Sequence, residues 1–368
     1  MTPDVAEELA AWVRLLLTPG VGRGVARQLL AAFGSPQAVF EASSAARQQC
    51  LGATPAGPLD DVPAALPTTM AALHGWLDGA QGRDWVALGD ARYPQSLLET
   101  ADPPLLLYTQ GDVRLLGNPC VAIVGSRNPT PQGAENAHAF AEHLGRAGLT
   151  IVSGLALGID GAAHGGALAA GASTIAVVGT GLDRIYPRKH RDLAHRIAER
   201  GLIVSEFELG TPPLAANFPQ RNRIIAGLCL GTLVVEAALE SGSLITARHA
   251  VEAGRDVFAI PGSIHSPQSR GCHALIKQGA KLVDDVRDVL DELRWTMLAA
   301  ASPSAVPAAT EVADPLLTAM GYEPVELDQL QARTGWPTAR LSASLLELEL
   351  AGRVARLPGG RYQRCGKA

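Results

Sequence analysis

An aromatic side chain stands among amides and arginines in one short run of the chain, Asn217-Phe218-Pro219-Gln220-Arg221-Asn222-Arg223. This combination suits single-stranded nucleic acid, because the ring of Phe218 offers a stacking plane for a base while Arg221 and Arg223 hold the phosphate backbone. In the alternative interpretation, Phe218 is a core residue, and the two arginines cap or pair with neighbouring loops.

Three loops of small residues indicate a ligand that carries phosphate. Each follows an apolar run, and they contain Gly125-Ser126-Arg127, Ser153-Gly154 and Ser241-Gly242-Ser243. Glycine lets a ligand approach the backbone, serine adds a hydroxyl, and the helix start behind each loop favours negative charge. Arg127 is placed for a bidentate phosphate contact. The turn after the first strand matches neither GxGxxG nor the P-loop pattern, so the usual dinucleotide and NTPase fingerprints are missing.

A local basic cluster follows Tyr186-Pro187 and consists of Arg188, Lys189, His190 and Arg191. Helix starts usually prefer acidic residues, so this cluster is a second candidate for phosphate contacts. The alternative is a solvated helix start.

Candidates for catalysis are fewer. Ser153, Asp160 and His164 are close in sequence, but Ser153 lacks the GxSxG elbow, and a histidine among small helical residues is typical of packing. Glu206 and Glu236 follow strands without a spacing that indicates paired acids, and we expect them to bind loop N–H groups. The histidines and cysteines show no metal-ligand spacing, so we expect no metal and no cofactor.

The elements that position these residues follow an α/β pattern. Between about Val86 and Trp295, short apolar runs alternate with Gly/Ser-rich turns and amphipathic helices, which predicts a parallel sheet with ligands bound beyond the carboxyl ends of its strands. We expect strands at 121–124, 149–152, 174–178, 202–204, 232–235, 257–260 and 281–283. We expect helices at 132–147, 162–170, 191–200, 221–228, 246–253 and 286–293. The stretch 87–107 is expected to wrap an edge of this sheet.

The flanking segments predict smaller domains. Residues 1–80 indicate short helices, including a hairpin at 16–33 that either presents N–H groups to a phosphate or is a tight packing turn. Residues 81–297 form the α/β domain, 298–312 an Ala/Pro linker, and 313–368 three helices with a two-stranded wing, which predicts a winged helix. Its third helix carries Arg340 against Glu347 and Glu349, so it is poorly charged for duplex DNA.

Composition bounds the class of protein. The 368 residues are 47% hydrophobic and 18% charged, which excludes a wholly disordered chain. The net charge of −5 excludes a polycation that coats nucleic acid, so any such site must be local. Five scattered cysteines argue against a disulfide framework, and no signal peptide or membrane span is apparent, so we expect a cytoplasmic protein.

Seven motifs in order resemble those of the DNA-processing protein A (DprA, or Smf) family. They begin at Val124, Val152, Gly179, Tyr186, Phe218, Ser241 and Gly254, and the dense resemblance runs from Tyr93 to about Leu293. It implies an extended Rossmann-like core that binds incoming single-stranded DNA during natural transformation, protects it and helps to load RecA, without catalysis. It also implies a homodimer and suggests single-strand-binding protein as a further partner.

The resemblance assigns the family's DNA pocket to Arg127, Arg188 and Phe218. Many relatives carry lysine three residues before the aromatic, where this chain has Ala215, so Lys189 or Arg223 is expected to supply that contact. One alternative is a nucleotide hydrolase similar to the Rossmann-like phosphoribohydrolases, although their PGGxGTxxE arrangement is missing. Another is a DNA-binding regulator that uses the winged helix.

Overall fold

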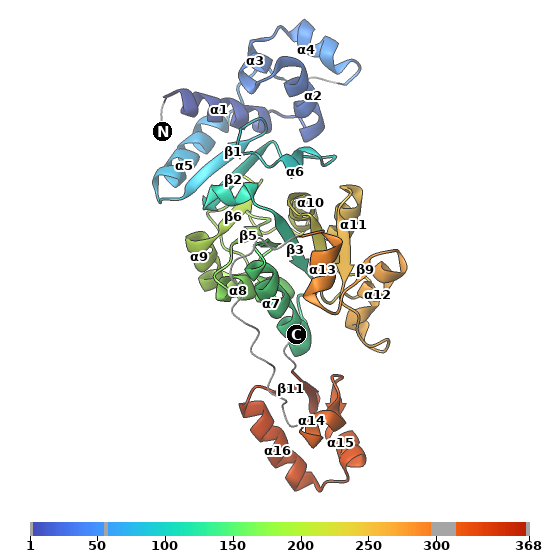
Figure 1. Ribbon diagram of the computed structural model, residues 1–368. Helices are drawn as coiled ribbons and strands as arrows, with labels where there is room; N and C mark the ends of the chain where they lie inside the picture. Colours follow the sequence, from blue (N-terminus) through green and yellow to red (C-terminus); the bar gives the residue numbers. More distant parts are fainter. Residues whose placement is uncertain (1–2, 55–57, 296–313, 366–368) are drawn as a thin grey trace. The chain divides into compact units, whose positions relative to one another are not determined.

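The computed structural model describes residues 3–54, 58–295 and 314–365. The chain divides into two compact units, which are described separately. The first unit comprises Met1–Asn118 and Ile175–Leu228, and the second comprises Pro119–Thr174 and Cys229–Ala368. Figure 1 shows the elements along the chain.

The first unit begins with a helical layer. Its helices are α1 (Pro3–Leu17), α2 (Arg23–Phe33), α3 (Pro36–Glu41), α4 (Ser44–Leu51) and α5 (Leu66–Asp78). Leu9, Val13 and Leu15 of α1 are fully buried. The turns are local: Ser35 Oγ accepts the N–H of Ala38 at the start of α3, and Gly34 ends α2 at φ 86°.

The strands of the first unit are β1 (Arg83–Ala87), β2 (Leu106–Gly111), β5 (Thr174–Val177) and β6 (Leu202–Ser205), in the order β1-β2-β6-β5. β5 and β6 are parallel, whereas β2 runs antiparallel to both β1 and β6. From the sequence, the stretch 87–107 is predicted to wrap an edge of the sheet. The chain adds two antiparallel strands there, because Leu106, Leu107 and Tyr108 extend and become buried directly after Pro103 and Pro104. The remaining elements are α6 (Gln95–Leu98), η1 (Val113–Gly117), η2 (Arg188–His190), α9 (Arg191–Arg200) and α10 (Asn217–Leu228).

The strands of the second unit are all parallel and have the order β4-β3-β7-β8-β9. They are β3 (Cys120–Val124), β4 (Thr150–Ser153), β7 (Gly231–Val234), β8 (Asp256–Ala259) and β9 (Lys281–Leu282). The helices are α7 (Pro131–Arg146), α8 (Ile159–Ala169), α11 (Ser243–Glu252), α12 (Arg270–Lys277) and α13 (Val286–Glu292), with the short η3 (Pro267–Ser269). Val121, Ile123, Phe140 and Phe258 belong to its core. A Cβ at Gly166 of α8 would overlap the backbone of His138 in α7, so this glycine permits their close packing.

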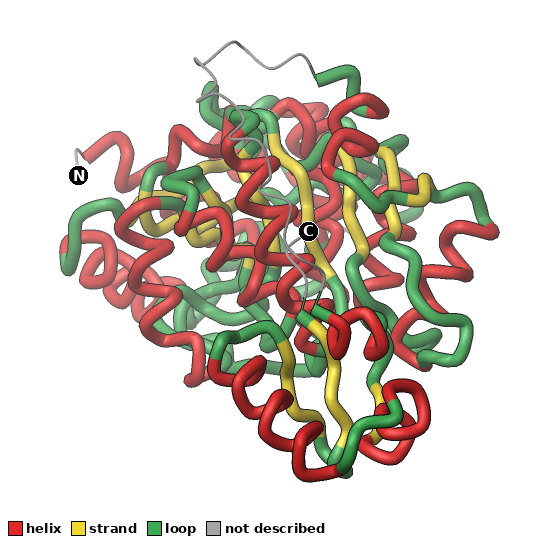
Figure 2. Tube along the Cα trace, turned by 60° about the horizontal axis from the view of Figure 1, so that its bottom comes forward, coloured by secondary structure: helices red, strands yellow, loops and turns green. Residues whose placement is uncertain are grey.

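The C-terminal portion has its own small core. It comprises α14 (Pro315–Met320), β10 (Val325–Glu326), α15 (Leu327–Thr334), α16 (Thr338–Leu350), β11 (Val354–Leu357) and β12 (Arg361–Arg364). Its antiparallel sheet has the order β10-β12-β11, so β10 adds a strand to the predicted wing (Figure 2). Leu316, Leu330, Leu341 and Leu345 fill the core.

The predicted fold class is confirmed: the chain is α/β with a mostly parallel sheet and a C-terminal winged helix. The predicted domain boundaries stay predictions, and the linker expected at 298–312 lies outside the described residues. No helix among the described residues is long and apolar enough to cross a membrane.

Candidate nucleic-acid interface

Two aromatic rings face each other beside the start of α10. The centroids of Tyr186 and Phe218 lie 5.7 Å apart, and the ring planes are tilted by 34°. Tyr186 is 47% exposed and Phe218 is partly buried, so the pair remains accessible. A Cβ at Gly179 would lie 3.1 Å from Phe218 Cδ1, which shows how closely the ring packs on the loop after β5. The result is a partly exposed aromatic platform in the first unit.

The residues around Phe218 hold α10 against this loop. Asn217 Nδ2 donates to the carbonyl oxygen of Gly179 at 3.1 Å. Arg221 is buried, with Nη1 donating to the carbonyl of Val177 at the end of β5 and Nε donating to Asn222 Oδ1. These contacts give Asn217 and Arg221 roles inside the fold. The predicted contacts of Asn217, Arg221 and Asn222 with DNA stay predictions.

Arg223 takes part in a closed ring of ion pairs, which we call the arginine-carboxylate ring. Its four members are Arg23 of α2, Asp102 before β2, Glu206 after β6 and Arg223 of α10. Asp102 Oδ2 lies 2.9 Å from Arg23 Nε and 3.0 Å from Arg223 Nε. Glu206 Oε2 pairs with the Arg223 guanidinium and lies 3.5 Å from Arg23 Nη1. Arg27 adds a further pair to Asp102. The ring ties the N-terminal helices to α10.

The carboxylates of the ring respond differently to their surroundings. Burial raises the pKa of Glu206 above its ordinary value, although Arg223 and Arg23 oppose the shift. Burial acts in the same direction on Asp102, but Arg223, Arg27 and Arg23 together lower the pKa of that carboxyl. Burial also lowers the pKa of Arg223. Asp102 is therefore the more firmly ionised of the two acids.

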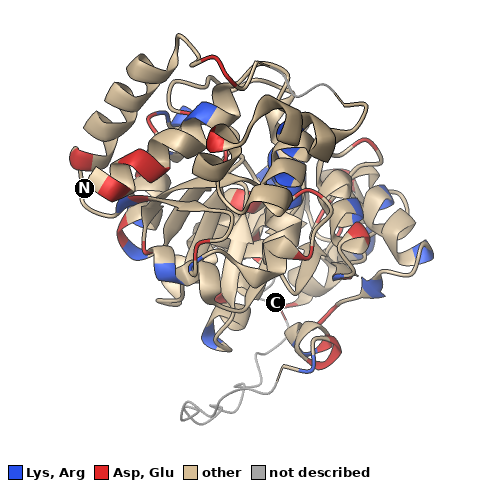
Figure 3. Ribbon diagram, turned by 90° about the horizontal axis from the view of Figure 1, so that it is seen from above, with Lys and Arg blue, Asp and Glu red and all other residues tan. Residues whose placement is uncertain are grey.

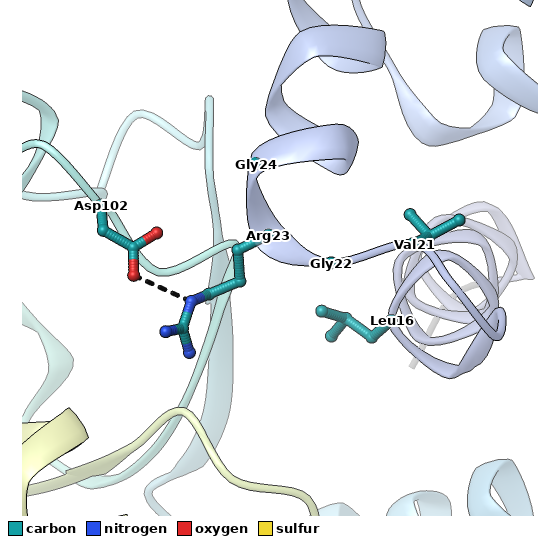
Figure 4. Close-up of a pocket in the computed structure, with 6 residues that line it drawn as sticks. All are labelled: Leu16, Val21, Gly22, Arg23, Gly24 and Asp102. Atoms are coloured by element: carbon teal, nitrogen blue, oxygen red, sulfur yellow. Dashed lines mark ion pairs between the residues drawn. The ribbon is translucent and has the colours of Figure 1, made fainter. Parts of the chain in front are cut away.

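A cavity of about 520 Å³ lies beside the ring at the N-terminal hairpin. Figure 4 shows Arg23 reaching towards Asp102 from the start of α2, with Leu16 and Val21 also lining the cavity. Gly22 caps α2 without a side-chain hydrogen bond. The hairpin predicted at 16–33 is present as the turn between α1 and α2, and Arg23 at the start of α2 belongs to the ring.

The predicted basic cluster lies on η2, directly after Tyr186 and Pro187. Arg188 and Lys189 are exposed, and neither has an ion-pair partner within the part of the chain that the structure describes. In the view of Figure 3, lysine and arginine are interspersed with acidic residues along the ribbon. Because Arg223 is already paired with two carboxylates, Lys189 is the better candidate for the contact that Ala215 cannot make.

In the second unit, the loop after β3 presents the exposed Arg127. Ser126 is buried: its Oγ accepts the N–H of Asn128 at 3.1 Å, and its carbonyl oxygen accepts the N–H of Ile159 at 3.1 Å. Gly158 has φ 84°, and a Cβ there would overlap the Ser126 carbonyl and lie 2.7 Å from Pro129 Cδ. The loop that carries Arg127 is thus held against the start of α8.

Glu236 holds the same loop from the end of β7. Its Oε2 accepts the N–H of Thr130 at 2.9 Å, and its Oε1 accepts the Thr130 hydroxyl at 2.6 Å. Thr130 Oγ1 in turn caps α7 by accepting the N–H of Gly133 at 3.0 Å. Burial raises the pKa of Glu236, while the two Thr130 hydrogen bonds oppose that shift. As expected from the sequence, this glutamate binds a loop N–H group.

The loop after β4 is also held by its own side chains. Asp160 Oδ2 accepts the N–H of Gly154 at 3.1 Å and that of Ala156 at 3.2 Å. Ser153 Oγ donates to Ile123 O, and His164 Nδ1 lies 2.7 Å from Thr174 Oγ1. Ser153 and His164 are fully buried, so the structure favours the packing interpretation for both.

The loop after β7 brings two serines together. Ser241 Oγ lies 2.7 Å from Ser243 Oγ and also accepts the N–H of Ser243 at 3.3 Å. Gly242 between them is exposed. No group of three or more His, Cys, Asp or Glu suited to a metal occurs among residues 3–54, 58–295 and 314–365.

Asp102, Arg23 and Arg27 are neighbours of the site that the sequence pattern does not predict. Nothing local marks them, because their pairing depends on contacts between segments about 80 to 120 residues apart, as the chain numbering shows. Tyr186 likewise has no role predicted from the sequence, although a tyrosine before a basic cluster is a recognisable signal.

Comparison with known proteins shows the family of this chain. The profile described as "DNA recombination-mediator protein A" matches residues 84–294, and the "DprA winged helix domain" matches residues 300–360. The chain belongs to the DNA recombination-mediator protein A (DprA/Smf) family. The resemblance predicted from its motifs is therefore confirmed.

Individual DprA relatives support this assignment. Protein Smf of Escherichia coli is 48% identical over 284 residues, which cover 75% of this chain and 76% of that protein. The DNA processing protein DprA of Streptococcus pneumoniae is 52% identical over 206 residues, or 56% of this chain and 73% of that protein.

Two solved DprA structures also match. The S. pneumoniae structure has a TM-score of 0.65 and 40% identity, and covers 78% of this chain and 97% of its own. The DprA structure from Helicobacter pylori, described in terms of a single-stranded DNA binding mode, has a TM-score of 0.52 and 33% identity, and covers 57% of this chain and 96% of its own.

Proposed function

We propose that this protein binds and protects incoming single-stranded DNA and promotes the loading of RecA onto it during natural transformation. The observation that carries the proposal is the partly exposed platform of Tyr186 and Phe218, followed directly by the exposed Arg188 and Lys189. Aromatic stacking beside a cationic strip is what sequence-independent single-strand binding requires. The single-stranded DNA binding named for the related H. pylori protein supports the same function.

In this proposal each unit offers contacts of its own to DNA. A base stacks on Phe218, and phosphates contact Arg188 and Lys189 in the first unit. Arg127, the N–H groups of Gly125 and Ser126, and the loop of Ser241, Gly242 and Ser243 take phosphates in the second unit, whereas the N–H group of Gly154, predicted from the sequence to do the same, donates to Asp160 Oδ2. Asn217, Arg221, Asn222 and Arg223 support the platform from within, given their contacts inside the fold.

We further infer that the protein acts by binding and not by catalysis. Both carboxylate oxygens of Glu236 accept hydrogen bonds from Thr130, so this acid is occupied in holding the loop. Hydrolysis of a nucleoside 5′-monophosphate by the purified protein, lost in Glu236→Gln, would contradict this inference and favour the phosphoribohydrolase-like alternative. A homodimer in the cytoplasm, with RecA and single-strand-binding protein as partners, completes the proposal.

The test is fluorescence anisotropy with a labelled oligo-dT and its duplex counterpart across a salt series. Preference for the single strand and an affinity that falls steeply with salt are expected. Equal affinity for the duplex would contradict the proposal. RecA loading is tested separately, by the rate at which RecA ATPase activity develops on DNA coated with single-strand-binding protein. An unchanged rate would contradict the loading role alone.

A further inference from the structure

Helix α16 of the winged-helix portion has an apolar surface that its own core does not use. Leu341, Leu345 and Leu348 pack into that core. On another face, Leu346 is 56% exposed and Leu350 is 81% exposed. Ala339 and Ala343 are also exposed and precede these leucines at a spacing of four, three and four residues. Because such a spacing keeps side chains on one face of a helix, the four residues form an outer stripe.

The side chains of the outer stripe are small at one end of α16 and large at the other. Its two alanines lie in the N-terminal half of α16, and its two leucines lie in the C-terminal half. If two copies of α16 lie antiparallel, Ala339 faces Leu350 of the partner and Ala343 faces Leu346 of the partner. Large side chains then meet small ones along the whole stripe, which allows close helix packing.

The charges beside the outer stripe fit the same arrangement. Arg340 and Glu347 are two helical turns apart and flank the stripe on the same side. Antiparallel pairing places Arg340 of each copy next to Glu347 of the other, so the contact occurs twice. Arg340 is held over the ring of Trp336, 3.8 Å from its centroid, and neither Arg340 nor Glu347 has an ion-pair partner within the described part of the chain.

DNA is a poor occupant for this face. The helix presents one arginine against Glu347 and Glu349, and two carboxylates repel a phosphate backbone. A second copy of the chain supplies both the apolar surface and the opposite charges. We propose that α16 pairs antiparallel with α16 of a second copy through Ala339, Ala343, Leu346 and Leu350, with Arg340 and Glu347 paired across the contact. The pairing has two-fold symmetry, so it closes at two copies.

The test measures the contact itself, because another surface of the full chain can also join two copies. A cysteine is introduced by Ala343→Cys in the full-length protein, which is treated with a short bis-maleimide. Covalent dimers are then quantified against the unmodified chain, which carries the natural cysteines. Asp328→Cys, at an exposed position on α15, is the matched control. Efficient dimer formation is expected only with Ala343→Cys, and Leu346→Asp in the same background should abolish it.

Charge exchange distinguishes the antiparallel arrangement from other contacts. Arg340→Glu or Glu347→Arg, each added to Ala343→Cys, should lower the dimer yield by about fivefold or more, because each places like charges together twice. Combining both changes in one chain should restore the yield, and so should mixing the two single-charge variants. The proposal would be overturned if the single-charge variants gave the same dimer yield as Ala343→Cys alone. It would also be overturned if neither the double variant nor the mixture restored the yield. None of these yields depends on DNA, so this proposal and the proposed DNA binding can fail independently of each other.

Discussion

The rings of Tyr186 and Phe218 lie 5.7 Å apart between centroids and are tilted by 34°. Tyr186 comes from the loop after β5, and Phe218 comes from the first turn of α10. The pair therefore depends on the position of α10, which the hydrogen bonds of Asn217 and Arg221 hold against that loop. Because these hydrogen bonds already hold the aromatic platform in place, it loses little conformational entropy when a base stacks on it.

Replacing Phe218 tests the platform. Phe218→Leu should weaken binding of oligo-dT by about 5- to 150-fold, because stacking on an aromatic is worth about 1–3 kcal/mol per base. Phe218→Tyr should bind nearly as well as the natural protein. Anisotropy titrations at several salt concentrations should give the same salt slope for all three proteins, since no phosphate contact changes. Unchanged affinity of Phe218→Leu would exclude stacking at this position.

Arg188 should act on phosphate instead. Arg188→Gln is expected to reduce the steepness of the plot of log affinity against log salt by about 0.7, the value for one phosphate contact on a single strand. The control is Arg114→Gln, since Arg114 is exposed but paired with Asp112. The same anisotropy series measures both variants. If the two slopes agree, Arg188 does not contact the DNA backbone.

The strands around the interface were predictable because each is a short, fully buried apolar run between small-residue turns. Val121, Ile151 and Leu233 illustrate this pattern. The start of α10 was less predictable. The sequence pattern predicts a start at Arg221, whereas the helix begins at Asn217. Pro219 is compatible with this earlier start, because proline is tolerated in the first helical turn, where its missing N–H group has no helical partner.

The interactions that fix the interface were not predictable in the same way. Arg223 suggested a phosphate contact because its neighbours are Phe218 and Arg221. Its actual partners, Asp102 and Glu206, come from distant segments, and no periodicity reports such a pairing. Electrostatic partners across loops depend on tertiary geometry, whereas strands and helices depend on local pattern.

Asp102 should contribute measurably to stability, because it is the acid shared by Arg23, Arg27 and Arg223. Asp102→Asn should lower the free energy of unfolding by about 2 kcal/mol, since it removes the carboxylate that three partly buried guanidinium groups share and leaves Arg23 and Arg223 with Glu206 alone. Glu292→Gln, which breaks the exposed pair with Lys281, should cost less than about 1 kcal/mol. Urea unfolding compares the two. Equal costs would show that the ring does not stabilise the first unit.

Substitutions at two glycines distinguish the effect of backbone strain on stability from the effect of loop position on DNA affinity. Gly158 and Gly148 both have positive φ, at 84° and 92°. A Cβ at Gly148 meets nothing within 4 Å, whereas one at Gly158 would overlap the Ser126 carbonyl. Gly148→Ala should cost about 1 kcal/mol of stability and leave DNA affinity unchanged. Gly158→Ala should cost more and also weaken oligo-dT binding, because the loop that carries Arg127 must move. Equal affinities of the two folded variants would contradict the proposed role of that loop.

The free energy of unfolding should depend on pH through Glu236, and the burial of this carboxyl determines the direction of that dependence. Burial raises the pKa of Glu236 in the folded protein, so the fold binds this proton more tightly than the unfolded chain does. Its contribution to stability is therefore fully present below the ordinary carboxyl pKa and is lost as pH rises through the raised value.

Glu236→Gln retains a carbonyl acceptor for Thr130 but removes this titration. Urea unfolding across the pH range should show the natural protein losing stability relative to Glu236→Gln as pH rises from acid to neutral. Glu240→Gln, at an exposed glutamate nearby, should follow the natural protein. A relative gain by the natural protein over the same range would mean that the Thr130 hydrogen bonds outweigh burial at Glu236.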